Sequence, residues 1–346
     1  MPEGHTLHRL AGSLNHAFAG TAPLASSPQG RFVEGAALLS GRPFLEAFAW
    51  GKHLFCSYAE DVFLHVHLGL IGSFDVREPA SGASRFGRSS NEHWPLERPG
   101  ERRGLDRRVE RGTSERGGEP ASGASRFGRS SNEHWPPEPV GAVRLRLVNA
   151  AYLADLRGAT HVAIATPEEV DSVIARLGPD PLRPLDSHND PERAWKRISK
   201  SPRSIADLLM DQAVLAGVGN VYRSEILFRH RVDPHRPGRE IRRQTWEALW
   251  ADVVLLLPIG VRLGQIVTMA DQVEDILAGE VDEALAPDAA SGVSAWRPNP
   301  LAGAVERRYY VYKRQGEPCR VCGSRIRTEV VAGRNLFWCG RCQRRR

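Results

Sequence analysis

The sequence predicts an α+β multidomain protein: a sheet-rich N-terminal half, a helical second domain and a small cysteine-bearing module at the C-terminus. Alternating strand-like segments occupy 42–67 and 142–156, whereas apolar residues at helical spacing dominate 191–263. Four of the five cysteines fall within 319–342. With 346 residues, the chain is long enough for two domains with separate cores.

Composition favours a soluble protein. The hydrophobic fraction is 41%, and the longest apolar-rich stretch, 253–257, is far too short to cross a bilayer. The first residues lack the basic and apolar blocks of a secretory signal. Crowded cysteines without such a signal favour metal ligation in a reducing compartment over a disulfide scaffold.

Positive charge is concentrated at one end of the chain. Residues 305–346 contain twelve Arg or Lys and three Asp or Glu, a net of +9, while the whole chain carries +6. The remainder is therefore close to −3. A basic module on a near-neutral body is typical of phosphate binding, and a solubilising tail is the alternative.

The first elements follow from apolar spacing and turn residues. An amphipathic helix is predicted after Gly4, and strands are predicted at Arg42–Trp50, His53–Tyr58 and Val62–His67. Gly51 marks the turn between the first two strands.

An internal repeat interrupts this half. Residues 78–95 recur identically at 119–136, and the material between them is rich in Arg, Glu and Gly. Two copies are too few for a solenoid, and the composition cannot build a core. We expect a disordered insertion over about 78–139; a DNA-contacting arm is the alternative.

The pattern then resumes. Strands are predicted at Ala142–Asn149 and Ala151–Leu156, and a helix at Thr166–Leu177, which opens with a capping threonine, a proline and two glutamates. We therefore expect an N-terminal domain over 1–182 and a linker at 183–190, where Pro184 follows Pro179 and Pro181 and leads into the polar run 186–190.

A helical domain is expected over 191–304, poorly patterned beyond about 270, followed by the basic module at 305–346. Within the helical domain, a helix ends near Gln212, a glycine-rich turn follows and Asn220 caps the next helix. This helix–two-turn–helix pattern suits a DNA strand, because glycines and a helix N-terminus admit a phosphate backbone. An ordinary helix hairpin is the alternative.

The cysteine spacing is the strongest local motif. Two Cys-x2-Cys pairs, Cys319/Cys322 and Cys339/Cys342, are separated by sixteen residues. Such pairs place four thiolates around one Zn2+, and four sulfur ligands leave no open position, so we expect one structural zinc ion. Cys56 lies in a strand-like segment and is expected to be buried.

The chain opens with Met1-Pro2-Glu3. Removal of Met1 would expose a prolyl amine. The pKa of an α-amino group is about 8, against about 10.4 for the lysine side chain. Such an amine can attack a sugar C1′ and form an imine, with Glu3 moving protons.

Taken together, these motifs resemble the formamidopyrimidine-DNA glycosylase/endonuclease VIII family. The resemblance rests on Pro2-Glu3-Gly4, Gly51-Lys52, the His67–Gly72 segment, Asn220 in its glycine-rich turn and the four cysteines, and it covers nearly the whole chain. It implies an N-terminal β-sandwich with flanking helices, a helix–two-turn–helix domain and a zinc finger.

The resemblance also implies roles for individual residues. Pro2 corresponds to the Schiff-base nucleophile, Glu3 to the proton donor and acceptor, and Lys52 to a lysine that contacts the backbone and assists catalysis. Leu70 corresponds to the wedge that fills the gap left by the flipped base. Phosphate contacts are implied for Asn220 and Arg334, and a place in the loop facing the opposite base for Arg157.

Departures from the family pattern favour one branch. His5 and Thr6 stand where many members have a second Pro-Glu, and residues 155–158 read Asp-Leu-Arg-Gly without a phenylalanine. The opening looks like the actinobacterial endonuclease VIII branch, which implies oxidised pyrimidines as substrates.

The expected function is therefore that of a bifunctional glycosylase and abasic-site lyase that cleaves by β/δ-elimination. The expected partner is double-stranded DNA with oxidised bases or abasic sites, with single-stranded or bubble DNA as a further candidate. We expect a monomeric, cytoplasmic, nucleoid-associated bacterial protein. A non-catalytic DNA-binding protein on the same scaffold and a zinc-ribbon adaptor are the alternatives; retention of Pro2, Glu3 and Lys52 favours the enzyme.

Overall fold

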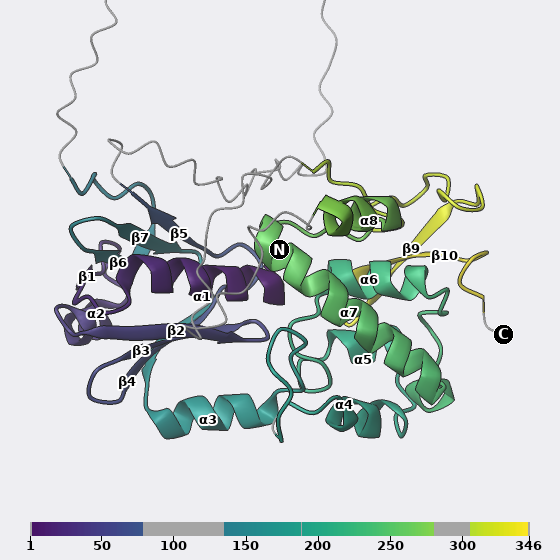
Figure 1. The fold of residues 1–346 in the computed structure, drawn as a ribbon, viewed down its shortest axis with the longest axis horizontal. Helices are drawn as coiled ribbons and strands as arrows, with labels where there is room; N and C mark the ends of the chain where they lie inside the picture. Colours follow the sequence, from purple (N-terminus) through teal and green to yellow (C-terminus); the bar gives the residue numbers. More distant parts are fainter. Residues whose placement is uncertain (1, 79–134, 188, 280–304, 345–346) are drawn as a thin grey trace, which may run out of the picture.

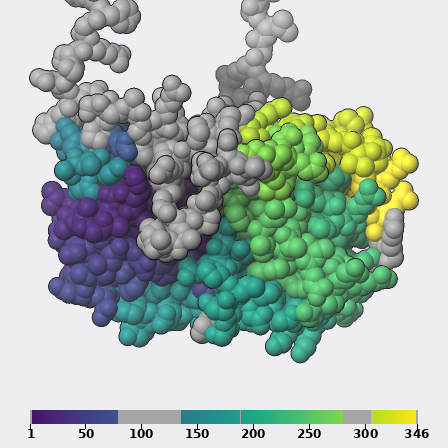
Figure 2. Space-filling model, viewed as in Figure 1, coloured from purple at the N-terminus to yellow at the C-terminus, as the bar shows by residue number. Residues whose placement is uncertain are grey.

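Two lobes lie side by side in the computed structural model, which describes residues 2–78, 135–187, 189–279 and 305–344. The N-terminal lobe holds the sheets and the C-terminal lobe the helices, and α1 (Gly4–Phe18) meets α7 (Arg243–Leu263) between them (Figure 1). In space-filling view the yellow C-terminal module covers the end of the helical lobe away from the N-terminal lobe (Figure 2). Most of the predicted insertion, residues 79–134, lies outside the described residues.

Two four-stranded antiparallel sheets form the N-terminal lobe, which confirms the predicted β-sandwich. Both sheets and α1 contribute to one apolar core. The first sheet contains, in order, β2 (Phe44–Trp50), β3 (His53–Tyr58), β4 (Val62–His67) and β8 (His161–Ala165). The second contains β1 (Leu24–Ser26), β6 (Val143–Val148), β7 (Leu153–Arg157) and β5 (Ser73–Arg77).

Several short elements were not predicted: β1, β5, β8 and α2 (Val33–Leu39) have no more than seven residues each. The strand predicted at 151–156 begins later, because the Asn149 side chain accepts the N–H groups of Ala151 and Tyr152 and forms a turn there. The predicted helix is confirmed as α3 (Pro167–Arg176), with a complete capping box between Thr166 and Glu169.

The second lobe is mostly helical. It contains α4 (Pro191–Ile198), α5 (Ile205–Met210), α6 (Asn220–Arg229), the 3-10 turn η1 (Gly238–Glu240), α7 and α8 (Ala270–Gly279). Trp246 and Tyr222 are among the largest side chains of its core. The expectation that patterning fails from about 270 is wrong for α8, where Val273 and Ile276 bury one face at helical spacing. Among the described residues, no helix is long and apolar enough to cross a membrane.

The C-terminal module is a hairpin of β9 (Ile326–Val331) and β10 (Arg334–Cys339). Its β10 strand packs against α6. Leu336 and Trp338 enter the core of the helical lobe, whereas Phe337 and Cys339 face a separate small core with the other cysteines. Alternate residues of one strand therefore attach the module and build its interior.

Candidate active site and nucleic-acid interface

Four segments that are distant in sequence meet between the lobes. We call this contact the interdomain seam and define it as residues 2–5, 50–52, 177–180 and 216–222. The Gly4 N–H donates to the Gly217 carbonyl at 2.8 Å. A Cβ on Gly4 would lie 2.7 Å from Gly217 Cα, and one on Gly51 would lie 2.9 Å from Ala216 Cβ. These glycines therefore allow the backbones to touch.

Glu3 is buried in this seam and caps α6 from the other lobe. Its carboxylate accepts the N–H groups of Gly219 at 2.9 Å, Val221 at 2.8 Å and Tyr222 at 3.5 Å. A helix N-terminus has unpaired N–H groups and favours a negative charge. The carboxylate thus fixes the position of the N-terminal segment that carries Pro2.

The expectation that Asn220 caps this helix is wrong. The cap position is Gly219, and Asn220 is the first helical residue, because Glu3 already occupies the N–H groups that a capping side chain would accept. Asn220 is instead a bridge: its Nδ2 donates to the Asn335 carbonyl at 2.9 Å, and its Oδ1 accepts from Arg223 at 2.6 Å. It connects α6 to the hairpin strand that bears Arg334.

Burial and mutual charge shift the pKa values of Glu3 and Lys52. Burial raises the pKa of Glu3, and the charge of Lys52 and the three N–H groups oppose that rise. Burial also lowers the pKa of Lys52, whose charge Glu3 favours and Arg334 and Arg223 disfavour. Both groups are shifted toward their neutral forms, which is the direction expected of groups that transfer protons.

Sequence reasoning missed two buried charged residues, one beside the seam and one within it. Arg223 is fully buried in α6, and burial lowers its pKa to about 10. Asp180 is also fully buried and accepts from His8 Nε2 and from the Gly51 N–H, each at 2.7 Å. Arg223 carried no distinctive sequence signal, because its helix also contains Ser224, Glu225 and Arg229. Asp180 lies between two prolines just before the predicted linker, where a buried carboxylate was not expected.

The structure shows what surrounds His5, which stands where many family members have a proline. His5 is buried, with its ring edge-on to Tyr222 at 5.7 Å between centroids. Burial lowers its pKa to about 3, so the ring is neutral at physiological pH.

The remaining expected site residues divide into two groups. Pro2 and Arg334 are half-buried, and Leu70 lies in the turn after β4 with 49% of its surface exposed. Arg157 is elsewhere, on β7 of the second sheet, where it pairs with Asp75 at 3.0 Å and Asp155 at 2.8 Å. The structure thus places Glu3, Lys52 and Asn220 at the seam and engages Arg157 in ion pairs within its sheet.

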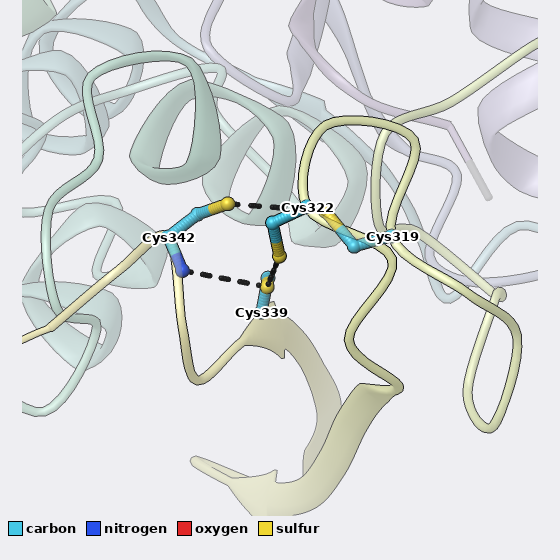
Figure 3. A group of neighbouring side chains, drawn as sticks. All are labelled: Cys319, Cys322, Cys339 and Cys342. Carbon is cyan, nitrogen blue, oxygen red and sulfur yellow. Dashed lines mark hydrogen bonds between the residues drawn. The ribbon is translucent and has the colours of Figure 1, made fainter.

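The four C-terminal cysteines converge as their spacing predicted (Figure 3). All four sulfur atoms lie within 4.8 Å of one another, with Cys322 and Cys339 at 3.4 Å and Cys319 and Cys342 at 3.9 Å. All are free thiols. Backbone N–H groups of Val321 and Cys342 point at the sulfurs of Cys319 and Cys339. This donor set fits a tetrahedral metal ion. Cys56 is buried in β3, as expected.

Comparison with known proteins agrees with this geometry. Residues 177–272 match the formamidopyrimidine-DNA glycosylase H2TH domain, and residues 316–345 match the zinc finger found in FPG and IleRS. The chain is similar to the Mycobacterium tuberculosis protein named Endonuclease 8 1, with 42% identity over 99% of this chain and 100% of that protein. A formamidopyrimidine-DNA glycosylase from Geobacillus kaustophilus is 33% identical over 54% of this chain and 58% of its own length.

Solved structures share the fold. The MutM (Fpg) protein of Thermus thermophilus aligns with a TM-score of 0.61 and 22% identity, covering 99% of this chain and 98% of that one. Lactococcus lactis Fpg in complex with abasic-site DNA aligns with a TM-score of 0.63 and 15% identity, covering 99% and 100%. Given the two family matches and the full-length relative, the chain belongs to the formamidopyrimidine-DNA glycosylase and endonuclease 8 family of DNA-repair glycosylases.

Proposed function

We propose that the protein is a bifunctional DNA glycosylase and abasic-site lyase that uses Pro2 as its nucleophile. The observation that carries this proposal is the buried Glu3 carboxylate, which caps α6 and lies beside Lys52 while directly following Pro2. A buried carboxylate and a lysine, both shifted toward their neutral forms and close to an N-terminal amine, support amine catalysis.

The proposed reaction begins after Met1 is removed. The Pro2 nitrogen lone pair attacks C1′, the bond from C1′ to the base breaks, and the base leaves with that electron pair and a proton supplied through Glu3. The Pro2 nitrogen then loses its proton, the C1′–O4′ bond of the sugar ring breaks and O4′ takes up a proton, which leaves a charged imine between Pro2 and C1′. This imine acidifies the C2′ protons. Loss of one such proton expels the 3′ phosphate, a further elimination expels the 5′ phosphate, and water releases the sugar fragment from Pro2.

The target nucleotide must leave the duplex before this attack, at a cost of about a few kcal/mol. We assign Leu70 to the vacated space, because it is an exposed apolar side chain on a turn. Lys52, Asn220 and Arg334 are assigned to the flanking phosphates. Asn220 bonds to the backbone of the residue next to Arg334, which supports a joint role.

The substrate is proposed to be an oxidised pyrimidine in double-stranded DNA. Two features support it: the absence of a phenylalanine at 155–158, and the full-length relative whose name is Endonuclease 8 1. The L. lactis neighbour in complex with abasic-site DNA supports DNA as the partner. A monomer in the bacterial cytoplasm, acting also on single-stranded or bubble DNA, is part of the same proposal.

The four cysteines are proposed to bind one structural Zn2+. The ion would hold the β9–β10 hairpin together at the end opposite Arg334, because Cys339 ends β10 and Arg334 begins it. No step of the chemistry is assigned to the metal.

Borohydride trapping tests the proposal. A duplex with an abasic site or thymine glycol is incubated with protein whose mass shows that Met1 is absent, and borohydride is added. We expect a covalent adduct, its loss in Pro2→Gly, and full trapping in the control Arg31→Gln, which alters an exposed residue. Binding without an adduct would establish the non-catalytic alternative, and an adduct that survives in Pro2→Gly would identify another nucleophile.

A further inference from the structure

A row of histidines crosses the first sheet on one face. His53, His67 and His161 are directly opposite one another on β3, β4 and β8. His65 lies two residues from His67 on the same face, and its Nε2 is 2.9 Å from His53 Nδ1. The His65 ring is 5.1 Å from that of His53 and 4.6 Å from that of His161, measured between centroids.

This row forms one wall of a pocket of about 280 Å³. Thr160 joins the four histidines, and α3 closes the other side with Arg176, Val173 and Leu177. The described residues that line the pocket include no carboxylate. Arg193 donates to the Ala175 and Leu177 carbonyls, so part of the negative end of α3 is already neutralised.

The surrounding charges decide which ligand fits. Four imidazoles would suit a transition metal, but Arg176 and the neighbouring Lys52 would repel a dication, and no lining carboxylate offsets them. An anion, by contrast, would be attracted by Arg176 and Lys52 and would meet no carboxylate among the described residues that line the pocket. A phosphate would accept from imidazole N–H groups and from the Arg176 guanidinium.

Position identifies the source of the phosphate. Lys52, proposed to contact the DNA backbone, directly precedes His53, and the turn with Leu70 follows His67. We infer that His53, His65, His161 and Arg176 form an additional phosphate site, which holds a backbone phosphate of the damaged strand beyond the one at Lys52. This inference rests on the proposed function, since it takes the ligand to be DNA.

Proton uptake is expected from the charges around the pocket. Burial, then repulsion from neighbouring imidazoles and Arg176, lowers the pKa of His53 to about 3 and of His65 to about 4. Burial and Lys52 lower that of His67. The groups facing the pocket are thus all cationic or neutral. A bound phosphate raises the imidazole pKa values, so binding takes up protons and strengthens as pH falls from 8 toward the free-state values of about 3 and 4.

Fluorescence anisotropy tests this with a labelled duplex containing a stable abasic analogue, measured at pH 6, 7 and 8. We expect the double variant His53→Gln/His161→Gln to lose part of the pH dependence. Arg176→Gln should raise Kd by about tenfold and reduce the salt slope by about one. The matched controls are His16→Gln, which alters a histidine near Tyr152, and Arg31→Gln.

A neutral methylphosphonate, moved one position at a time along the damaged strand, locates the phosphate. At one position, the methylphosphonate should weaken binding of the wild-type protein and have no further effect on binding of the double variant. The site is overturned if the pocket variants, with unchanged melting temperature, bind like the controls. It is also overturned if inorganic phosphate shifts the histidine NMR signals while the pocket variants leave DNA affinity unchanged, or if those histidines bind added Zn2+.

Trapping separates this inference from the proposed function. Failure of wild-type trapping with the histidine effect intact would overturn only the lyase chemistry. Normal trapping without that effect would overturn only the phosphate site.

Discussion

The zinc hairpin and the interdomain seam both organise residues for DNA, but they are built differently. The hairpin is local: its four cysteines lie within 24 residues, and β9 and β10 are adjacent strands. The seam joins residues more than 200 positions apart, such as Glu3 and Val221, through a buried carboxylate and touching glycines. A local motif tolerates changes elsewhere, whereas a seam depends on each surface that meets there.

This difference predicts the largest effect at a glycine of the seam. A Cβ at Gly219 would lie 2.4 Å from Glu3 Cδ, so Gly219→Ala must displace the carboxylate. Misplacement of a catalytic group by about 1 Å can reduce rate about a hundredfold, and we expect that loss in single-turnover cleavage of abasic DNA. Gly279→Ala, where a Cβ meets nothing within 4 Å, is the control. Equal rates for the two variants would show that the seam is not tightly packed around Glu3.

Loss of the zinc site in the hairpin should weaken DNA binding and leave the rest of the fold intact. Cys339→Ser removes a ligand of the four-sulfur cluster, so we expect zinc loss and DNA affinity at least about tenfold weaker, with α1 and the sheets intact. Metal analysis, anisotropy and hydrogen exchange measure the three effects. Cys56→Ala, a change in the buried β3 cysteine, should retain the metal. Unchanged affinity in the zinc-free variant would separate the hairpin from DNA binding.

Glu3 should show opposite effects on activity and stability. Its pKa in the folded state is raised, so its charge at pH 8 destabilises the fold, and this penalty disappears as pH falls below the value in the unfolded chain. Glu3→Gln should therefore lose activity yet melt at or above the wild-type temperature at pH 8, with the difference shrinking toward pH 4. The exposed control Glu34→Gln should show neither effect. A lower melting temperature at pH 8 would mean that the N–H bonds from α6 outweigh the burial of charge.

The smallest effect is expected at Arg157, outside both regions. Its partner Asp155 also accepts from Arg146 at 2.7 Å, so Arg157→Gln leaves that carboxylate paired. We expect a small drop in melting temperature and unchanged affinity for abasic DNA, measured beside Arg31→Gln. A marked loss of affinity would instead support the DNA contact that the family resemblance implies for Arg157.

Sequence patterns were most informative where structure is local. The limits of β3 and β4, the Thr166 capping box and the convergence of the four cysteines follow from alternation, cap chemistry and ligand spacing. Short strands such as β1 and β8 were not predicted. Pairing with distant strands stabilises them, and their own three to five residues carry little sequence pattern.

The sequence alone therefore predicted the order of the domains and the metal-binding module from residue type and spacing, and its resemblance to the family gave Pro2, Glu3 and Lys52 as a candidate set. Only the tertiary structure decided that Glu3 caps α6 in place of Asn220, that Asp180 holds the turn before Lys52, and that four histidines share one pocket with Arg176. Each of these depends on burial and on backbone groups brought together from distant segments, and a linear pattern does not contain that information.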